Sequence, residues 1–150
     1  MLKSAGILAY RLVSGELEFF LVHPGGPFFT RKDDGVWTVP KGLVEGDEDL
    51  LVTAKREFLE ETGIVVSGDF VSLGHVVQKG GKHVHCFGVE FDLDTSAVIS
   101  NTFEMQWPPN SGKLSIFPEV DRGEWFSLEM ARLKINSQQA TLLDRLIALL

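Results

Sequence analysis

The chain has 150 residues, of which 44% are hydrophobic and 23% charged, and its 14 Lys+Arg against 21 Asp+Glu give a formal charge of −7. The apolar fraction is enough to bury a real core at this length, which excludes a disordered acidic tail. A single cysteine, Cys86, excludes an internal disulfide and therefore a disulfide-stapled miniprotein.

The same numbers limit the partners of the protein. No apolar run approaches the roughly 20 residues that cross a bilayer, and the first residues lack a signal peptide, so we expect a single cytoplasmic domain without a membrane partner. The acidic balance disfavours nucleic acid, because that binding depends mainly on Lys and Arg. Small anionic substrates stay open, because a bound divalent cation can reverse the local field. The sequence indicates no particular oligomeric state.

Apolar residues alternate between strand-like and helix-like spacing, without a repeat or a linker, and predict one mixed α/β domain over residues 1–150. Residues 6–13 and 17–22 predict a hairpin, because Ser14-Gly15-Glu16 forms a glycine-containing turn. Further strands are expected at residues 36–39, 70–77, 84–91, 114–117 and 124–126. Irregular stretches are expected at residues 23–35 and 95–113. Loops of this length inside a compact domain are more often functional than idle.

Three helices are expected. The first begins at Asp47, whose side chain can cap it, and ends at Gly63, which supplies a left-handed stop. Ser127 can cap a short second helix that extends through Leu133. Ser137 can cap the last helix, whose apolar stripe consists of Leu142, Leu143, Leu146, Ile147 and Leu150.

The first helix carries three carboxylates at spacings of three and four residues: Glu57, Glu60 and Glu61. At about 100° per residue they fall on one arc roughly 100° wide. Relative to Glu57, the apolar positions of the helix lie at roughly 20° to 120°, and Glu61 lies near 40°. The carboxylates therefore converge beside the apolar stripe.

A charge run on a helix is usually a solvated face, and such a face would lie opposite the apolar stripe. Carboxylates that border the stripe would instead repel one another and raise their own pKa values unless a cation lies between them. Arg56 could pair with Glu60, but one such pair is worth roughly a few tenths of a kcal/mol and cannot neutralise all three. Mg²⁺ fits better, because it takes oxygen ligands from carboxylates and leaves positions for water and phosphates.

The segment before this helix can complete a metal site. Lys41-Gly42 follows a strand through Pro40, and Gly42 and Gly46 allow a bend that brings backbone groups close to the helix. A carbonyl turned toward the carboxylates could add an oxygen ligand. These features indicate metal-assisted chemistry on a phosphorylated ligand.

A longer pattern runs through residues 42–64. It reads Gly42, five residues, Glu48, seven residues, and then Arg56-Glu57-Phe58-Leu59-Glu60-Glu61-Thr62-Gly63-Ile64. Every fixed position of the Nudix box is filled, and Trp37-Thr38-Val39-Pro40-Lys41 resembles the usual lead-in. The chain therefore resembles the MutT-like Nudix hydrolase family. That resemblance implies an α/β/α sandwich with a mixed β-sheet.

The resemblance also implies hydrolysis of a pyrophosphate linkage in a nucleoside diphosphate joined to another group, with Mg²⁺ or Mn²⁺ as cofactor and a small nucleotide as substrate. Metal ligands implied in this way are Glu57, Glu60, Glu61 and the carbonyl of Lys41. Arg56 would orient the glutamates, and Glu48 would brace the loop against the helix or join the outer metal shell.

The implied chemistry is in-line attack of water on phosphorus. Glu57 is the first choice for the group that takes the proton. Glu119, in Pro118-Glu119-Val120-Asp121, is a second choice from outside the box, and an exposed turn carboxylate is an equally good interpretation of it.

Substrate choice depends on residues outside the box. Ser4-Ala5-Gly6, the box lead-in, and Pro118-Glu119 followed by Trp125 resemble the diadenosine-polyphosphate branch, while ADP-ribose and nucleoside triphosphates stay open. Aromatic residues that could stack on a base, with core packing as the default, are Phe28, Phe29, Trp37, Phe103 and Trp107. Basic residues that could contact phosphates, with solvated loop charges as the default, are Arg31, Lys32, Lys79 and Lys82.

Two other interpretations of the sequence are less favoured. His83-Val84-His85-Cys86 offers three zinc ligands, but adjacent residues on a strand point to opposite faces, which disfavours zinc. A non-catalytic nucleotide-binding or regulatory module with the same fold is the alternative from another class. Such modules usually have a degraded box, so retention of all the carboxylates favours catalysis.

Overall fold

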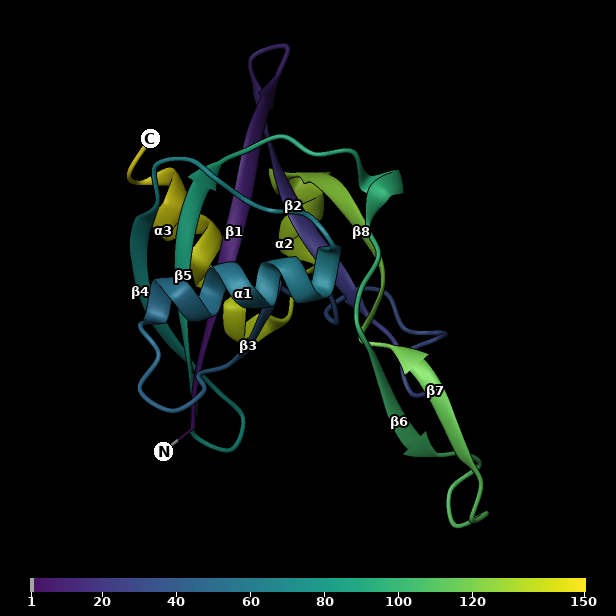
Figure 1. Cartoon of the computed structure of the whole chain (residues 1–150). Helices are drawn as coiled ribbons and strands as arrows, with labels where there is room; N and C mark the ends of the chain where they lie inside the picture. The colour runs from purple at the N-terminus through teal and green to yellow at the C-terminus, as the bar shows by residue number, and fades with distance from the viewer. Residues whose placement is uncertain (1) are drawn as a thin grey trace.

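The structure is a computed structural model that describes residues 2–150. Within these residues, a six-stranded mixed sheet forms the centre of the protein (Figure 1). Its strands are β1 (Lys3–Val13), β2 (Glu16–Pro24), β3 (Lys41–Leu43), β4 (Val71–Gln78), β5 (Lys82–Glu90) and β8 (Val120–Ser127). The order is β4-β5-β1-β2-β8, with β3 paired to the start of β1. β1 and β5 run parallel, and the other pairs are antiparallel. The expected mixed sheet is confirmed.

Helices cover both faces of this sheet. α1 (Leu50–Thr62) lies on one face, and α2 (Leu128–Lys134) and α3 (Ala140–Ile147) lie on the other (Figure 1). Alternate residues of β1 point into two cores: Ile7 packs in the core that contains Phe58 of α1, and Leu8 in the core that contains Leu142 of α3. The expected α/β/α sandwich is therefore present. In residues 2–150, every helix is too short or too polar to cross a membrane.

The hairpin of β1 and β2 is confirmed, with a shorter turn than expected. Glu16 pairs with Val13 and belongs to β2, so the turn consists of Ser14 and Gly15. Both have positive φ, 51° and 82°, as a two-residue turn between twisted strands requires.

The start of α1 differs from the expectation, and its end agrees with it. The capping position is Asp49 rather than Asp47, and the Asp49 side chain accepts no capping hydrogen bond. The loop continues two residues further because Glu48 turns back and accepts the backbone N–H of Glu45. At the other end, Gly63 has a φ of 74° and donates its N–H to Leu59, as expected for a left-handed stop.

Two predictions of local structure are wrong. The stretch 95–113 is not irregular throughout, because it contains a short 3₁₀ helix, η1 (Thr95–Ala97), and the strand β6 (Thr102–Gln106). β6 pairs with β7 (Leu114–Pro118) in a hairpin that projects from the sheet (Figure 1). Conversely, residues 36–39 form only isolated bridges, in which Trp37 pairs with Ile135 and Thr38 with Val22. Each residue bonds a different segment, so no continuous ladder forms.

The C-terminal region is mostly as expected. Ser127 caps α2 by accepting the N–H of Met130. The expected cap at Ser137 is wrong: Asn136 caps a 3₁₀ helix, η2 (Ser137–Gln139), and α3 follows it. The buried stripe of α3 consists of Leu142, Leu143 and Leu146. Leu150 lies beyond the end of α3 and is exposed, so it does not belong to the stripe.

Candidate active site

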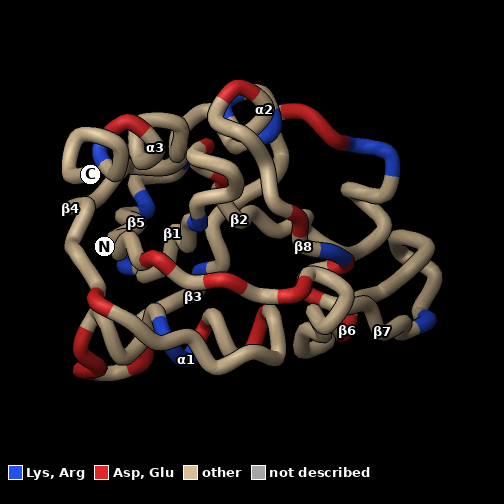
Figure 2. Tube along the Cα trace, turned by 90° about the horizontal axis from the view of Figure 1, so that it is seen from above, with Lys and Arg blue, Asp and Glu red and all other residues tan. Residues whose placement is uncertain are grey.

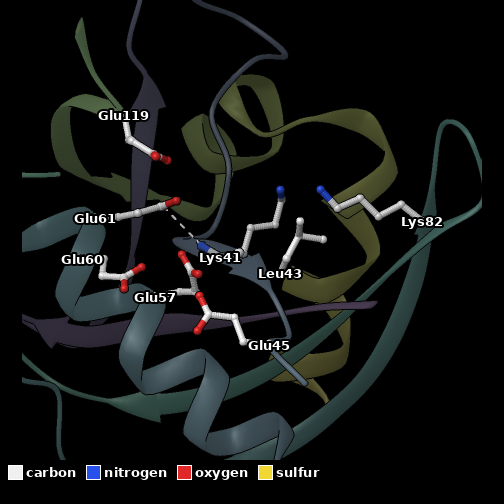
Figure 3. Close-up of a pocket in the computed structure, with 9 residues that line it drawn as sticks. Lys41, Leu43, Glu45, Glu57, Glu60, Glu61, Lys82 and Glu119 are labelled. Carbon is white, nitrogen blue, oxygen red and sulfur yellow. Dashed lines mark hydrogen bonds between the residues drawn. The ribbon is translucent and has the colours of Figure 1, made fainter. Parts of the chain in front are cut away.

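A cavity of about 490 Å³ lies beside α1 and β3, with carboxylates on one side and ammonium groups on the other (Figure 3). Its acidic lining consists of Glu45, Glu57, Glu60, Glu61 and Glu119. Its basic lining consists of Lys41 and Lys82. Acidic positions also gather along α1 and in the loop that leads into it (Figure 2).

Segments far apart in the sequence meet at this cavity. β3 pairs with β1 and brings Lys41 next to α1, where its N–H donates to Oε1 of Glu61 at 3.2 Å. The parallel pairing of β1 with β5 places Lys82, the first residue of β5, on the same side. Glu119 comes from the junction between β7 and β8, where its N–H donates to the carbonyl of Asn101 at 2.8 Å. The structure thus brings Glu119 together with the box residues.

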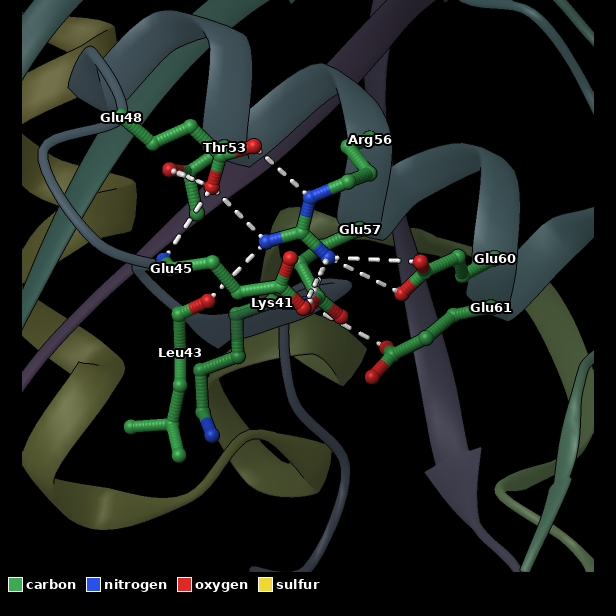
Figure 4. A network of polar contacts seen from close by, with 9 residues as sticks. All are labelled: Lys41, Leu43, Glu45, Glu48, Thr53, Arg56, Glu57, Glu60 and Glu61. Atoms are coloured by element: carbon green, nitrogen blue, oxygen red, sulfur yellow. Dashed lines mark hydrogen bonds and ion pairs between the residues drawn. The ribbon is translucent and has the colours of Figure 1, made fainter.

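Arg56 is the centre of a polar network on the helix side of the cavity (Figure 4). Its guanidinium donates to both carboxylate oxygens of Glu48 at 2.9 Å, to Glu57 at 2.8 Å and to Glu60 at 3.2 Å. It also donates to the carbonyl of Leu43 at 3.0 Å. These bonds, first of all that to Glu48, raise the pKa of Arg56. The expected Arg56–Glu60 pair is therefore one contact of several, and Arg56 lies where it can orient two of the three glutamates.

Glu48 lies outside the lining of the cavity and joins the loop to the helix. Its Oε1 accepts from the hydroxyl of Thr53 at 2.7 Å and from the N–H of Glu45 at 3.2 Å. Hydrogen bonds from Arg56 and then from Thr53 lower the pKa of Glu48 from its ordinary 4.5 to about 2. Glu48 therefore contacts both the loop and the helix, and its role in the reaction stays a prediction.

The three candidate metal ligands are buried to different extents. Burial raises the pKa of Glu61 to about 8, against the opposing effect of Lys41. Burial also raises the pKa of Glu57, whose side chain is 12% exposed, although the bond from Arg56 lowers it. The Glu60 side chain is 36% exposed. Full ionisation of this cluster is therefore unfavourable unless positive charge is added.

The donor set fits a hard divalent cation by its chemistry, because carboxylate oxygens in a water-accessible cavity are the ligands that Mg²⁺ and Mn²⁺ prefer. The carboxylates do not yet converge on a common position: in the described residues, no three His, Cys, Asp or Glu side chains are arranged as a preformed metal site. Arg56 holds Glu57 and Glu60 in their present positions. Cation binding would therefore have to draw these carboxylates away from the guanidinium.

Two basic residues form the opposite wall. The side chain of Lys41 points away from the glutamates, and its ammonium group lies toward that of Lys82 (Figure 3). Burial lowers the pKa of Lys41, and the charge of Lys82 lowers it further. Lys82 was a candidate phosphate contact with a solvated loop charge as the default, and only the backbone carbonyl of Lys41 was expected in the site. Burial and the charge of Lys82 both disfavour the charged form of Lys41, and a bound anion would stabilise that form. This wall of the cavity therefore favours binding of an anion. Glu45 was also missed, because its contact with Arg56 depends on the fold of the loop.

The remaining aromatic and basic candidates lie outside the cavity lining. Trp37 is 1% exposed and packs in the core against Phe126, so core packing, the default interpretation, is confirmed for this candidate. Phe28 meets Trp107 edge to face, with ring centroids 5.4 Å apart. Candidates that do not line the cavity are Phe29, Phe103, Arg31, Lys32 and Lys79.

The strand with two histidines and a cysteine is divided between the two faces of the sheet. His83 and His85 lie near His75 of β4, with ring centroids 4.7 and 5.2 Å from that of His75. Cys86 is fully buried among core residues with Val84. His83 and His85 thus lie on one face of the sheet and Cys86 on the other, as the alternation of a strand predicts.

The sheet between two layers of helices and the acidic cavity beside α1 are the features that a comparison with protein families can test. The family model described as NUDIX domain matches residues 3–146, so the chain belongs to the Nudix family.

Two curated relatives are similar over part of the chain. The bis(5′-nucleosyl)-tetraphosphatase (asymmetrical) of Caenorhabditis elegans is 38% identical over 64 residues, which are 43% of this chain and 42% of that protein. The RNA pyrophosphohydrolase of Bartonella bacilliformis is 30% identical over 110 residues, 63% of this chain and 59% of that protein. The chain thus matches less than two thirds of the length of either relative.

Solved structures are similar over nearly the whole chain. The binary complex of the C. elegans Ap4A hydrolase has a TM-score of 0.67 and 25% identity, and the match covers 99% of this chain and 97% of that one. The NUDIX domain of Shewanella oneidensis NrtR, complexed with ADP ribose, has a TM-score of 0.67 and 17% identity, with coverage of 99% and 87%. The second likeness concerns the fold alone. Another NrtR structure contains DNA, so the expectation of no nucleic-acid partner stays a prediction.

Proposed function

We propose that the protein is a Mg²⁺- or Mn²⁺-dependent pyrophosphohydrolase that cleaves a phosphoanhydride bond in a nucleotide. The observation that carries the proposal is the joint placement of Glu57, Glu60 and Glu61 along one cavity whose other wall carries two lysines. A cavity with an acidic and a basic wall suits a ligand that carries phosphates together with a divalent cation. Candidate substrates are dinucleoside polyphosphates, as the name of the C. elegans relative suggests, ADP-ribose and nucleoside triphosphates.

Glu57, Glu60 and Glu61 are the residues that would hold the cation, with the carbonyl of Lys41 as a further oxygen. A bound cation would neutralise charge that develops on the phosphate oxygens and lower the pKa of water in its shell. Arg56 would orient Glu57 and Glu60, and Glu48 would keep Arg56 in place through its paired hydrogen bonds. Lys41 and Lys82 would bind phosphate oxygens on the opposite wall.

Proton transfer is assigned to Glu57, with Glu119 as the alternative. Burial raises the pKa of Glu57, which makes its carboxylate a stronger base than an exposed glutamate. In this proposal, Glu57 accepts the proton of the water that attacks phosphorus in line, and the leaving phosphate departs on the far side. Glu119 lines the same cavity, from the junction between β7 and β8.

The deciding experiment is hydrolysis of a nucleotide panel by the purified protein. Diadenosine polyphosphates, ADP-ribose, nucleotide sugars and nucleoside triphosphates are incubated side by side with Mg²⁺, with Mn²⁺ and with a chelator, and the products are separated. We expect cation-dependent cleavage of at least one substrate. Tight binding of a nucleotide without cleavage would overturn the proposal and favour the non-catalytic module.

A further inference from the structure

His23 is a buried histidine whose two ring nitrogens both face hydrogen-bond acceptors. Its Nδ1 lies 2.9 Å from Oδ1 of Asp121, its Nε2 lies 2.7 Å from the carbonyl oxygen of Lys32, and its side chain is 2% exposed. A neutral imidazole carries one N–H, and an ionised carboxylate and a carbonyl only accept. Two hydrogen bonds of this kind are satisfied together only when both ring nitrogens carry a proton.

A β-bulge brings Asp121 to this ring. His23 of β2 pairs with Arg122 of β8, whereas the next residue, Pro24, pairs with Val120, so Asp121 is the extra residue of β8. In a regular strand, adjacent side chains point to opposite faces. At this bulge Asp121 contacts His23, and Arg122 lies 5.1 Å from the ring centroid of Trp37, which itself meets His23 edge-on. The bulge therefore turns two neighbouring side chains to the same face.

The ring joins the long loop after β2 to the segment that carries Glu119. Lys32 belongs to the long loop between β2 and β3, and Asp121 lies two residues after Glu119. The same loop begins at Gly25, whose N–H donates to the carbonyl of Glu119 at 2.9 Å. His23 thus connects the middle of the loop to the strand segment from which Glu119 reaches the cavity.

One charged side chain, Asp121 of β8, contacts His23 directly. The others belong to the shell around Trp37, the ring that meets His23: Arg122 of β8 lies over Trp37, and Asp33 of the loop accepts from Trp37 and pairs with Lys134 of α2. The carboxylate of Asp33 accepts hydrogen bonds from Nζ of Lys134 at 2.6 Å and from Nε1 of Trp37 at 2.8 Å. Asp121 is thus the counter-charge in direct contact with the ring.

We propose that His23 is a doubly protonated, positively charged positioning residue that holds the loop and the start of β8 together. Loss of one ring proton leaves two acceptors facing each other at either Asp121 or Lys32, so one of the two contacts opens. The loop and the Glu119 segment are then no longer joined through the ring. The consequence for catalysis rests on the proposed function, whereas the charge state of His23 does not.

The test is direct observation of the ring protons. Nitrogen-15 NMR of the full chain distinguishes an imidazolium, with two equivalent protonated nitrogens, from a neutral ring, with one protonated and one bare nitrogen. We expect the imidazolium signature for His23 in the folded wild type, because both ring nitrogens face acceptors. In Asp121→Asn, the side-chain amide can donate to Nδ1, so we expect a neutral ring with its proton on Nε2. A neutral His23 in the wild type, or the same charge state in both proteins, would overturn the proposal.

Hydrogen exchange gives the second readout, because the backbone N–H of Lys32 bonds the carbonyl of Phe29 only while the loop is folded. After correction for the intrinsic rate, we expect protection of the Lys32 amide in the wild type to fall about threefold or more over the pH range in which the NMR signal changes from imidazolium to neutral ring. In Asp121→Asn, where a neutral ring keeps both bonds, protection should stay constant. Equal pH dependence in both proteins would contradict the role of the charge. Neither readout needs hydrolysis, so it stays interpretable if the nucleotide panel is not cleaved.

Discussion

The backbone of Gly42 lies directly against the carboxylate of Glu57. A Cβ atom on Gly42 would overlap the carboxyl group of that side chain. Gly42 is not among the positions with positive φ, so close approach is what requires glycine here. The first fixed position of the box and one of its glutamates are thus parts of the same contact.

We therefore expect Gly42→Ala to lower turnover by about 10²-fold or more, because the methyl group displaces Glu57 from the cavity. Steady-state hydrolysis of the best substrate measures this loss. The control is Gly80→Ala in the turn between β4 and β5, where a Cβ would meet open space and only the strain of a positive φ is added. Wild-type turnover in Gly42→Ala would show that the position of Glu57 does not matter.

Loss of one carboxylate charge should act on catalysis rather than on folding. We expect Glu57→Gln and Glu60→Gln to keep the folded structure and to lower turnover by about 10²-fold or more, because each removes a charge that the cation needs. Circular dichroism and thermal unfolding check the fold, and titration with Mn²⁺ checks metal affinity. The matched control is Glu104→Gln, an exposed glutamate on β6. Full activity in both site variants would contradict the assignment of the ligands.

The carboxylate cluster was predictable because its geometry is local. Glu57, Glu60 and Glu61 share a helix, so their convergence follows from the helical period, as does the stop at Gly63. The start of α1 was less predictable, because the side chain of Glu48 bonds the backbone of Glu45 and extends the loop. Residues whose partners lie within one or two turns could thus be placed from the sequence.

Contacts between distant segments could not be placed in this way. Lys82 reaches the cavity only because β1 and β5 are parallel neighbours, and Asp121 reaches His23 only because of a bulge in β8. Trp37 was a candidate for stacking on a base, with core packing as the default, and in the structure its indole N–H bonds Asp33 and its ring fills the core. Such positions depend on sheet pairing, which residue spacing does not determine.

The bracing role of Glu48 makes a prediction about pH. Its folded-state pKa, about 2, lies below its ordinary 4.5, so ionised Glu48 stabilises the fold above about pH 4.5, and this contribution is lost as the pH falls toward 2. We expect Glu48→Gln to lower the Tm most at neutral pH, and the difference from the wild type to shrink between about pH 5 and about pH 2. Unfolding is measured in chelator, so that bound cations do not contribute. A Tm difference that is independent of pH would contradict this account.

The basic wall of the cavity predicts a change in substrate affinity. We expect Lys82→Gln to raise the KM of the best nucleotide substrate by about tenfold and to change kcat less, because it removes a charged contact to phosphate without touching the carboxylates. Lys113→Gln, in the exposed loop between β6 and β7, is the matched control and should keep the wild-type KM. Inhibition by inorganic tripolyphosphate supplies a second measurement: its inhibition constant should rise in parallel with KM in Lys82→Gln. An unchanged KM and inhibition constant in that variant would mean that the substrate's phosphates do not reach the basic wall.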